Sequence, residues 1–571
     1  MRLTGSVAVN LDCVEALLCM RVQLRRGVAA VISWIITNCI ARIRYVEFLH
    51  RVPPQPEQRK LSAFDESLLQ ILNQALREGH TCFPLASLIT RVEVELGANK
   101  TSPEAILSAL ERLQTHHRIR LTDKHVSLTQ CVNAEETIAK GLMRIGRRAR
   151  PINPTRLGQF IESSASNLSN EQRDAVRLIA NAPVSILTGA PGTGKTATVK
   201  ASLDVFEQAG YKVRLAAPTG RAAQRLREVT DHPAQTLHRM LRADRPEPRS
   251  ILNRIFPVAD VVIVDEASMI DVFLMAQLIK VCTPSTKLIL VGDVNQLPSI
   301  GAGQVLFDLI ESGTVPVVEL RTNFRQTNGS QIITAAEAIK EGRVPDLPAP
   351  GQTKSDCYFI EAETAAEAAR LVVNAATKSL PARCGADPYQ NIQVLTPKHR
   401  GWLGTILLNE RIQIALRECE SESGSAAHSF LPGDRVLHTK NNYRLNVFNG
   451  QCGSVQETTD ETVTVKFGER EVTYSPASLP ELTPGFAITI HRSQGSEYPF
   501  VIIPIHESQQ PMLSRELLYT AITRGQKMVV LIGSRRALEM AVENTVRGKL
   551  QTGLKQALVE TMSARGAARI A

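Results

Sequence analysis

The strongest pattern along the chain is a set of short apolar runs that do not alternate with polar residues. Helical segments separate the first four, at residues 184–187, 213–217, 261–264 and 288–291. A second series follows at residues 392–395, 500–503 and 528–532. Strands that are apolar on both faces are typical of a parallel sheet covered by helices on both sides. The pattern therefore predicts an α/β fold with two parallel sheets.

A different pattern interrupts the second series. Residues 425–483 lose helical spacing and become short strands at 434–438, 453–456, 462–467 and 471–474. Short strands separated by turn residues predict a small β-barrel. We expect this barrel to be an insertion in the second α/β domain.

The N-terminal part of the chain follows a third pattern. Residues 51–59 are rich in Pro, Gln and Arg and predict a linker. Helical spacing then predicts three short helices and a strand–turn–strand, at residues 64–77, 83–94, from 102 onward, and 118–128. This order is a winged-helix pattern. It serves either to bind DNA through the wing or to support the rest of the chain, and the sequence leaves both roles open.

Length, charge and cysteine usage narrow the class of protein. At 571 residues the chain is too long for a single core. The net charge is +10, and residues 1–150 hold 21 Lys and Arg against 14 Asp and Glu. Such a basic excess favours a polyanionic partner, above all nucleic acid. The ten cysteines form no C-x-x-C pair. This argues against zinc fingers and favours free thiols in a reducing compartment, so we expect a cytoplasmic protein.

One apolar segment, residues 27–36, has the composition of a weak membrane anchor. It follows two arginines, but Ser33, Thr37 and Asn38 interrupt it. It is also shorter than the roughly 20 residues that a membrane span needs. We expect a buried or interface helix here and no stable membrane insertion. The alternatives are a start site placed too far upstream and a peripheral membrane contact.

A glycine-rich loop directly after the apolar run 184–187 carries the clearest chemistry. It reads Gly189, Ala190, Pro191, Gly192, Thr193, Gly194, Lys195 and Thr196. In a strand–loop–helix arrangement, glycines let backbone N–H groups close around phosphates, while the lysine reaches the β- and γ-oxygens. The threonine hydroxyl in this motif binds Mg²⁺. The loop therefore predicts a site for a nucleoside triphosphate.

Further charged residues complete a hydrolysis site. Asp265 and Glu266 end the apolar run 261–264, where Asp265 is expected to hold Mg²⁺ and Glu266 to orient the attacking water. Gln296 follows the run 288–291 and is a candidate sensor of the γ-phosphate. Phosphoryl transfer needs positive charge on that phosphate beyond the one lysine, and Arg325 and Arg524 stand where a second domain could supply it.

Together these blocks give the chain a family resemblance. From residue 168 to 540 it resembles a superfamily 1B helicase of the RecD family. The matching blocks are residues 168–172, 189–196, 217–223, 236–241, 264–269, 292–303, 324–326, 489–497 and 519–524, with 441–443 and 447–450 in the barrel.

The resemblance implies two RecA-like parallel-sheet motor domains with ATP between them, and a 5′→3′ ATP-dependent DNA helicase acting on single strands and their junctions with duplex. It implies that Gln172 reads the adenine and that Gly495 and Glu497 couple DNA to the nucleotide. It also assigns a set of residues to the single strand: Pro218, Thr219, His238, Asn442, Thr489 and His491.

These expectations give a domain organisation. It comprises an N-terminal helical segment of unassigned role (1–50), a winged-helix-like domain (60–150), a first motor domain (160–318) with a short insertion near 242–256, a second motor domain (319–424 and 484–545), an SH3-like barrel insertion (425–483) and a C-terminal tail (546–571).

The sequence leaves three functions open. In relatives, a β-hairpin before the Asp-Glu strand splits the duplex, but here residues 242–250 are short, proline-rich and without a hairpin glycine. One alternative to a helicase is therefore a single-strand translocase or protein-displacing subunit of a larger recombination, mobile-element or CRISPR-type complex. Another is an ATP-gated binding module, which the complete set of hydrolysis residues disfavours.

Overall fold

The computed structural model describes residues 61–97, 102–241, 259–324, 329–419, 430–440, 442, 444–445, 447–459, 461–547 and 549–570. Residues Met1–Glu66 and Ser67–Ala571 form two separate compact units. The N-terminal segment 1–50 with its apolar run 27–36, the linker 51–59, the insertion near 242–256 and Arg325 lie outside the described residues. Within the described part, none of the helices combines the length and hydropathy that crossing a membrane requires.

The first α/β series forms a six-stranded parallel sheet in the order β6-β5-β7-β8-β4-β9. Its strands are β4 (Val184–Gly189), β5 (Val213–Ala217), β6 (Ala234–Thr236), β7 (Val261–Val264), β8 (Lys287–Gly292) and β9 (Val317–Leu320). Its helices are α7 (Pro154–Ser164), α8 (Asn170–Asn181), α9 (Lys195–Gln208), α10 (Gly220–Thr230), α11 (Leu237–Leu241), α13 (Val272–Val281) and α14 (Val305–Ser312), with a 3-10 turn η2 (Ala267–Met269).

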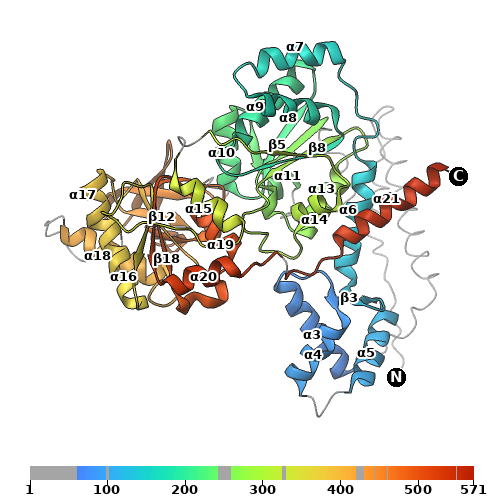
Figure 1. The fold of residues 1–571 in the computed structure, drawn as a ribbon, viewed down its shortest axis with the longest axis horizontal. Coiled ribbons are helices and arrows are strands. Elements are labelled where there is room, and N and C mark those ends of the chain that lie inside the picture. Colours follow the sequence, from blue (N-terminus) through green and yellow to red (C-terminus); the bar gives the residue numbers. More distant parts are fainter. Residues whose placement is uncertain are drawn as a thin grey trace, which may run out of the picture. The chain divides into compact units, whose positions relative to one another are not determined.

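Both faces of this sheet are buried, as the continuous apolar runs predicted. Neighbouring residues of one strand join different cores: Ile186 packs with α13 and α14, whereas Leu187 packs with α8 and α9. Figure 1 shows these two helical layers on opposite sides of β5 and β8. The period of two along a strand therefore divides one apolar run between two hydrophobic cores.

The second series forms a five-stranded parallel sheet in the order β10-β19-β18-β11-β17. One of its faces packs against α15, α19 and α20, and the other against α16, η3, α17 and α18. The strands are β10 (Cys357–Glu361), β11 (Ile392–Thr396), β17 (Ala487–Thr489), β18 (Tyr498–Ile505) and β19 (Gly525–Gly533). The helical elements are α15 (Gln331–Lys340), α16 (Ala365–Asn374), η3 (Ala375–Ser379), α17 (Leu380–Cys384), α18 (Thr405–Cys419), η5 (Ile490–Ser493), η6 (Glu507–Met512), α19 (Arg515–Ile522) and α20 (Arg535–Glu543).

The insertion between α18 and β17 is a five-stranded antiparallel sheet in the order β15-β14-β13-β12-β16. Its core surrounds Tyr474, which is fully buried. The elements are β12 (Arg435–His438), β13 (Cys452–Thr458), β14 (Val463–Phe467), β15 (Arg470–Tyr474), η4 (Leu479–Glu481) and β16 (Leu482–Pro484). The predicted α/β fold with two parallel sheets and a small β insertion is confirmed.

The N-terminal helices carry a three-stranded antiparallel sheet in the order β1-β3-β2. The elements are α3 (Ala63–Arg77), β1 (Phe83–Pro84), α4 (Leu85–Leu96), α5 (Pro103–Thr115), β2 (Ile119–Leu121) and β3 (His125–Leu128). The helix predicted from residue 83 begins two residues later, because Phe83 and Pro84 pair with β3 as an edge strand. A two-residue strand is too short to leave a period in the sequence.

Helices from the two ends of the chain complete the core of the first motor domain. α6 (Thr129–Arg144) packs on α13, and α21 (Leu554–Ile570) packs on α6 and α14. Residues 60–150 and 546–571, expected as a separate domain and as a tail, thus both contribute to this core. Glu135 on α6 accepts hydrogen bonds from the Thr81 hydroxyl (2.6 Å) and the Gly553 N–H (2.9 Å), which ties the two ends together.

We expect Leu554→Ala to lower the free energy of unfolding by about 2–4 kcal/mol, because it leaves a cavity in this core. Leu554 is 1% exposed. Val559 on the same helix is 44% exposed, so Val559→Ala is the matched control and should change stability by less than about 0.5 kcal/mol. Urea unfolding of the full chain measures both. Equal effects would show that α21 is not part of the core.

A buried carboxylate next to this junction makes stability depend on pH. Burial raises the pKa of Asp308 on α14 to about 7, and its Oδ1 accepts from the Thr552 hydroxyl. The folded state therefore favours the protonated acid, and the resulting stabilisation is complete below pH 4 and lost as the pH rises through about 7. We expect Asp308→Asn to match the unchanged protein at about pH 4 and to exceed its stability by a growing margin between about pH 5 and pH 8. Urea midpoints across this range test it, and a difference independent of pH would contradict it.

Candidate functional site

The glycine-rich phosphate-binding loop, residues 189–196 (the P-loop), is held between the buried strand β4 and the first turn of α9. Gly192 and Gly194 have φ values of 87° and 81°, a left-handed conformation that favours glycine. Gly194 is the N-cap of α9, so the N–H groups of the first helical turn face the loop. The Lys195 ammonium donates to the carbonyl oxygens of Gly189 (2.6 Å) and Ala190 (3.0 Å). The sequence order strand, loop, helix thus produces a preformed anion site.

Burial lowers the pKa of Lys195, although nearby Asp293, Glu266 and Asp265 favour its charged form. A lysine in this setting gains from any further negative charge placed beside it. Burial also disfavours the charged form of a carboxylate, so it raises the pKa of a carboxyl group instead of lowering it. Burial and then the Glu266 charge raise the pKa of Asp265 to about 6, and the Lys195 charge opposes this.

Asp265 and Glu266 follow β7, whose four residues are all buried. The Glu266 N–H donates to Asp265 Oδ1 at 2.9 Å. Glu266 itself has φ 53° and ψ 41°, a left-handed conformation that is rare for a residue with a side chain. Strained backbone of this kind is concentrated at functional sites, where the surrounding structure holds it in place.

Two buried polar atoms beside the P-loop have no hydrogen-bond partner within the described residues: Gln296 Oε1 and Arg524 Nη2. The rest of the Arg524 guanidinium is fixed by the carbonyl oxygens of Thr520 (3.1 Å) and Ser496 (3.2 Å). Gln296 Nε2 donates to Asp293 at 3.3 Å. An unpaired guanidinium N–H is costly when buried, and a phosphate oxygen would satisfy it.

These groups surround one cavity of about 340 Å³ that both motor domains line. The lining contains eleven of the residues predicted from sequence: Pro191, Gly192, Gly194, Lys195, Thr196, Asp265, Glu266, Gln296, Gly495, Glu497 and Arg524. Ala222, Arg225, Leu226 and Phe324 complete it. Residues more than 300 positions apart in sequence therefore meet in one cleft.

An ion pair spans this cleft. Arg225 on α10 contacts Glu497 of the second motor domain at 2.8 Å. One helical turn earlier, Arg221 donates to the Tyr498 hydroxyl at 2.9 Å and lies over the Tyr498 ring. Both arginines share one face of α10, as the i, i+4 spacing requires. This helix face connects the first domain to the second.

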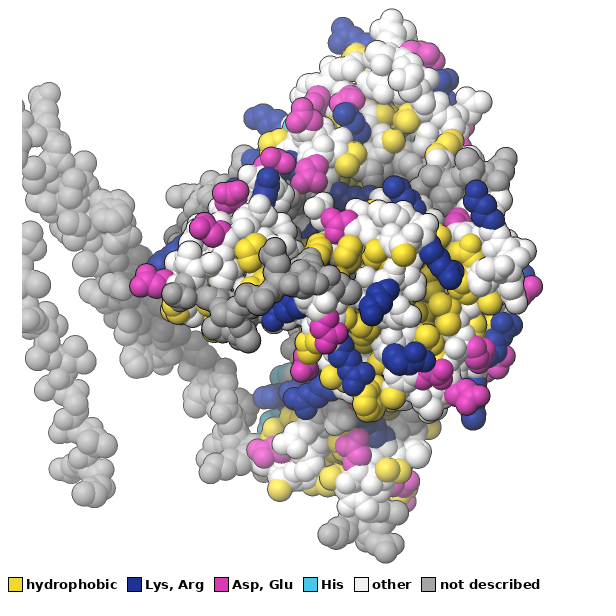
Figure 2. All heavy atoms as spheres, turned by 90° about the vertical axis from the view of Figure 1, so that its left-hand side faces the viewer, with side chains coloured by type: hydrophobic (Ala, Val, Ile, Leu, Met, Phe, Trp, Pro, Cys, Tyr) yellow, Lys and Arg dark blue, Asp and Glu magenta, His cyan; other side chains and the backbone are white. Residues whose placement is uncertain are grey.

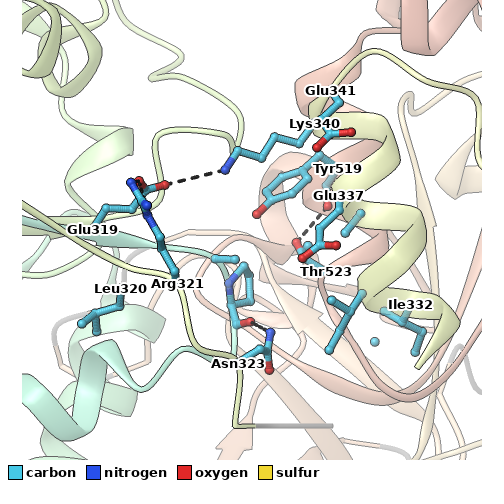
Figure 3. Close-up of a pocket in the computed structure, with 15 residues that line it drawn as sticks. Glu319, Leu320, Arg321, Asn323, Ile332, Glu337, Lys340, Glu341, Tyr519 and Thr523 are labelled. Atoms are coloured by element: carbon cyan, nitrogen blue, oxygen red, sulfur yellow. Dashed lines mark hydrogen bonds and ion pairs between the residues drawn. The ribbon is translucent and has the colours of Figure 1, made fainter. Parts of the chain in front are cut away.

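The segment that joins the two sheets is also tied to the P-loop. The Phe324 N–H donates to the carbonyl oxygen of Gly192 (2.9 Å), and Asn323 Nδ2 donates to that of Pro191 (3.0 Å). A second cavity of about 400 Å³ adjoins the loop here. Figure 3 shows its two walls, with Glu319, Arg321 and Asn323 facing Lys340 and Tyr519, and the Glu319–Lys340 ion pair (3.7 Å) crossing between them.

The residues expected near a single strand lie at the carboxyl ends of strands in both sheets. Pro218 and Thr219 follow β5, and His238 follows the neighbouring strand β6, which pairs with β5 in parallel. Thr489 ends β17 in the second sheet, and its hydroxyl caps η5, which contains His491. Burial lowers the pKa of His491, so its imidazole is neutral near pH 7.

A groove of about 680 Å³ lies between α10, β6 and the β insertion. Arg227, Arg239 and Arg470 line it, and Phe448 of the insertion packs on Gly220. A Cβ at Gly220 would lie 2.7 Å from the Phe448 Cβ, so only glycine allows this approach. Asn442 also lies in the insertion, with its amide bonded to Glu481 Oε2 at 3.1 Å. Glu228 and Glu469 also line the groove, so its walls carry three arginines and two glutamates beside the aromatic residues Phe448 and Phe467.

Three family models match the chain over these regions. Residues 167–354 match an AAA domain, residues 408–467 the SH3 domain of ATP-dependent RecD-like DNA helicases, and residues 484–532 a UvrD-like helicase C-terminal domain. The RecBCD enzyme subunit RecD of Mycobacterium tuberculosis is 32% identical over 532 residues, covering 86% of this chain and 90% of that protein. The chain belongs to the RecD family.

Other relatives agree with this membership. The RecBCD subunit RecD of Mycolicibacterium smegmatis is 34% identical, covering 68% of this chain and 74% of that protein. The ATP-dependent RecD2 DNA helicase of Deinococcus radiodurans is 37% identical over 66% of this chain, which spans 51% of that protein's length. Among solved structures, a Pif1 helicase from Bacteroides in complex with ADP-AlF3 and ssDNA has a TM-score of 0.41 at 19% identity, covering 64% of this chain and 92% of that one.

Not every residue predicted for this RecD-family site lines the cleft. Gln172 is buried, forms a capping box with Ser169 and donates from Nε2 to the Thr193 carbonyl (3.3 Å). Gly189, Ala190 and Thr193 likewise shape the loop without lining that cavity. The Thr193 hydroxyl donates to the Ala190 carbonyl at 2.8 Å.

Sequence reasoning gave no role to several residues in and beside the RecD-family cleft. Arg221 and Arg225 were detectable as two arginines at helical i, i+4 spacing just after a buried strand. No pattern in the sequence predicted that Phe324 would be exposed. In the structure this residue is 54% exposed and lines the cleft. An exposed aromatic ring beside a P-loop can stack on a planar base.

We expect the Arg225–Glu497 pair to couple the two motor domains. Glu497→Gln should lower DNA-stimulated ATP hydrolysis several-fold, because it removes the charge that holds α10 against the second domain. Arg225→Ala should do the same, and the double variant should be no worse than either single one, since both remove the same interaction. ATPase assays on the three variants test this. Multiplicative losses would contradict a direct coupling.

Proposed function

We propose that the chain is an ATP-dependent DNA helicase that moves 5′→3′ on single-stranded DNA. The observation that carries this proposal is the cleft itself, with a P-loop and two carboxylates from one RecA-like sheet and an arginine from the other. A site divided between two domains changes shape when it binds and hydrolyses its ligand. Membership of the RecD family supports DNA as the track.

The residues of the cleft fit ATP and Mg²⁺. The Lys195 ammonium and the N–H groups of the loop suit the phosphates, and the unpaired Arg524 Nη2 suits the γ-phosphate. Thr196 and Asp265 would hold Mg²⁺, and a cation there relieves the repulsion that raises the pKa of Asp265. Mg²⁺ would neutralise developing charge on the phosphates. Glu266 would orient the attacking water.

Hydrogen bonds link the γ-phosphate end of the cleft to the second domain. Two hydrogen bonds join the segment after β8 to α19. The Tyr519 hydroxyl donates to Asp293 Oδ2 (3.0 Å), and the Leu297 N–H donates to the Thr520 hydroxyl (2.9 Å). Gln494 Nε2 donates to the Leu297 carbonyl at 3.1 Å. A change at Gln296 therefore acts on the helix that ends beside Arg524, and on the turn that follows Thr489. Alternating closure and opening would move the two DNA-contacting edges relative to one another.

The DNA track proposed here follows the carboxyl ends of the strands. Thr219, His238, Thr489 and His491 supply polar side chains there, and the arginine-containing groove beside Phe448 extends this surface to the β insertion. Arginines and an aromatic residue in a groove suit a single strand, whose phosphates and bases they contact. We place this activity in the cytoplasm, where ATP and DNA are available.

A second candidate is a translocating motor subunit within a larger complex. Relatives with high coverage are named as subunits of the RecBCD enzyme, which favours this reading. In the N-terminal domain, Arg91 of α4 is engaged by Glu78 and Glu95, and Arg120 of β2 by Glu136, so these arginines are already paired within the chain.

A fork assay separates the two candidates. We expect the purified chain with ATP and Mg²⁺ to open a fork with a 5′ tail and not one with a 3′ tail. Lys195→Ala should reduce DNA-stimulated ATP hydrolysis at least 100-fold, because the lysine that reaches the β- and γ-phosphates is lost. Chelation of Mg²⁺ should do likewise. DNA-stimulated hydrolysis without opening of either fork would exclude the autonomous helicase and leave the translocase.

A further inference from the structure

An exposed tryptophan stands on the second motor domain, outside every residue assigned to DNA so far. Trp402 lies in the loop between β11 and α18 and is 48% exposed. Tryptophan is highly buried on average in folded proteins, so exposure of this ring needs a reason. Ile406, the second residue of α18, lies four positions after it and is 62% exposed. Figure 2, which faces the side of α16, α17 and α18, shows hydrophobic, basic and acidic side chains intermixed.

The loop that carries Trp402 is rigid. The Thr405 N–H donates to the Lys398 carbonyl (3.1 Å), and the Gly404 N–H donates to that of Gly401 (2.9 Å). His399 Nδ1 bonds the Thr405 hydroxyl at 3.0 Å. A Cβ at Gly404 would lie 2.4 Å from the His399 carbonyl oxygen, so the loop is closed too tightly for any other residue. The exposed ring is therefore presented by a fixed backbone.

The ring is also held by a cation. The Arg411 guanidinium lies 4.6 Å from the centroid of the Trp402 ring. A cation over an indole face fixes the ring and adds positive charge next to it. The ring thus keeps a defined orientation while almost half of the residue stays open to solvent.

The loop lies at the edge where the proposed single strand passes. β11 and β17 pair in parallel, with Thr396 opposite Thr489, so both strands end at the same edge of the sheet. The 398–404 loop follows the first of these strands, and η5 with His491 follows the second. The Arg492 charge reaches His399, whose pKa is lowered by burial and by that charge. The two loops are therefore neighbours.

The charge of the loop is positive. Residues 398–402 read Lys, His, Arg, Gly and Trp, with no acidic side chain. Lys398 Nζ donates to the Ser508 carbonyl at 2.5 Å, and Arg400 is exposed. The nearest acidic residue along the chain, Glu410, lies on the exposed surface of α18. A basic aromatic surface suits nucleic acid better than an acidic or purely apolar partner.

We propose that Trp402, held by Arg411 and flanked by Arg400, is a base-stacking subsite for single-stranded DNA on the second motor domain. The subsite rests on the proposed function, since it lies beside the same DNA track. A base stacks on the open part of the indole while Arg400 contacts a neighbouring phosphate. Stacking is independent of base identity because every base has a π-face. The subsite thus grips the strand without reading its sequence.

Intrinsic fluorescence tests the proposal directly. The chain has two tryptophans, Trp34 and Trp402, so Trp34→Phe leaves Trp402 as the sole reporter. We expect oligo(dT) to quench its fluorescence at saturation. An abasic strand of the same length should bind without quenching, because it offers phosphates and no base. Quenching by the abasic strand, or none by oligo(dT) at a concentration that saturates binding by anisotropy, overturns the proposal.

Substitutions separate stacking from charge. Trp402→Ala should weaken oligo(dT) binding about tenfold with an unchanged salt slope, and Trp402→Phe should stay within about threefold. Arg400→Ala should lower the slope of log K against log salt by about 0.7, the value for one phosphate of a single strand. Ile414→Ala is the matched control, since Ile414 is 49% exposed on α18 and carries no ring. Thermal midpoints check folding of each variant.

The outcomes distinguish this subsite from the proposed function. If the unchanged protein shows no DNA-stimulated ATP hydrolysis, the proposed function fails. If hydrolysis is stimulated but Trp402→Ala binds oligo(dT) as tightly as Ile414→Ala does, the stacking subsite fails alone. Equal binding by all variants, with Trp402 quenched only by a partner protein, would make this face a protein contact and overturn the proposal.

Discussion

The hydrogen bonds between the segment after β8 and α19 connect the two halves of the motor. Tyr519 reaches Asp293, and Thr520 reaches the backbone of Leu297, across the boundary between the sheets. Their partners are buried beside the P-loop, so the cost of leaving them unpaired keeps the contact in place. Arg524 is positioned by the same helix, since its Nε bonds the Thr520 carbonyl. The same helix, α19, therefore both positions Arg524 and forms the contact between the domains.

A second constraint comes from the connection between the sheets. The segment after β9 bonds to the backbone of Pro191 and Gly192 before it enters the second domain. Glu171 on α8 accepts from the N–H groups of Arg321 and Thr322 in the same segment. The linker is thus anchored beside the nucleotide cleft. A movement of the second domain would therefore act on the P-loop through these hydrogen bonds rather than through a free tether.

Much of the fold followed from periodicity, because a strand buried on both faces has to be apolar throughout. The run that contains Ile263 and Val264 was predicted as one strand because it is apolar throughout. In the structure these two residues belong to different cores. The P-loop, Asp265, Glu266 and Gln296 followed from their position directly after such strands, whereas Gly495 and Glu497 followed from the family resemblance. Arg225 did not, because an arginine on a helix is usually solvated, and its partner Glu497 lies 272 positions away. Strand β1 and the packing of α21 on the first domain were not predicted either, because neither corresponds to a periodic pattern of apolar residues in the sequence.

Local spacing along the chain was enough to predict the two parallel sheets, the β insertion, the P-loop and the charged groups that a triphosphate needs. Each of these features is encoded by residues that lie close together in sequence. The folded structure was needed to show which of those groups meet, which buried polar atoms are left unpaired and where Trp402 lies. These features depend on contacts between segments hundreds of residues apart and on burial. Burial changes the energy of a charge, and it is set by the packing of the whole fold rather than by the residues next to that charge in sequence.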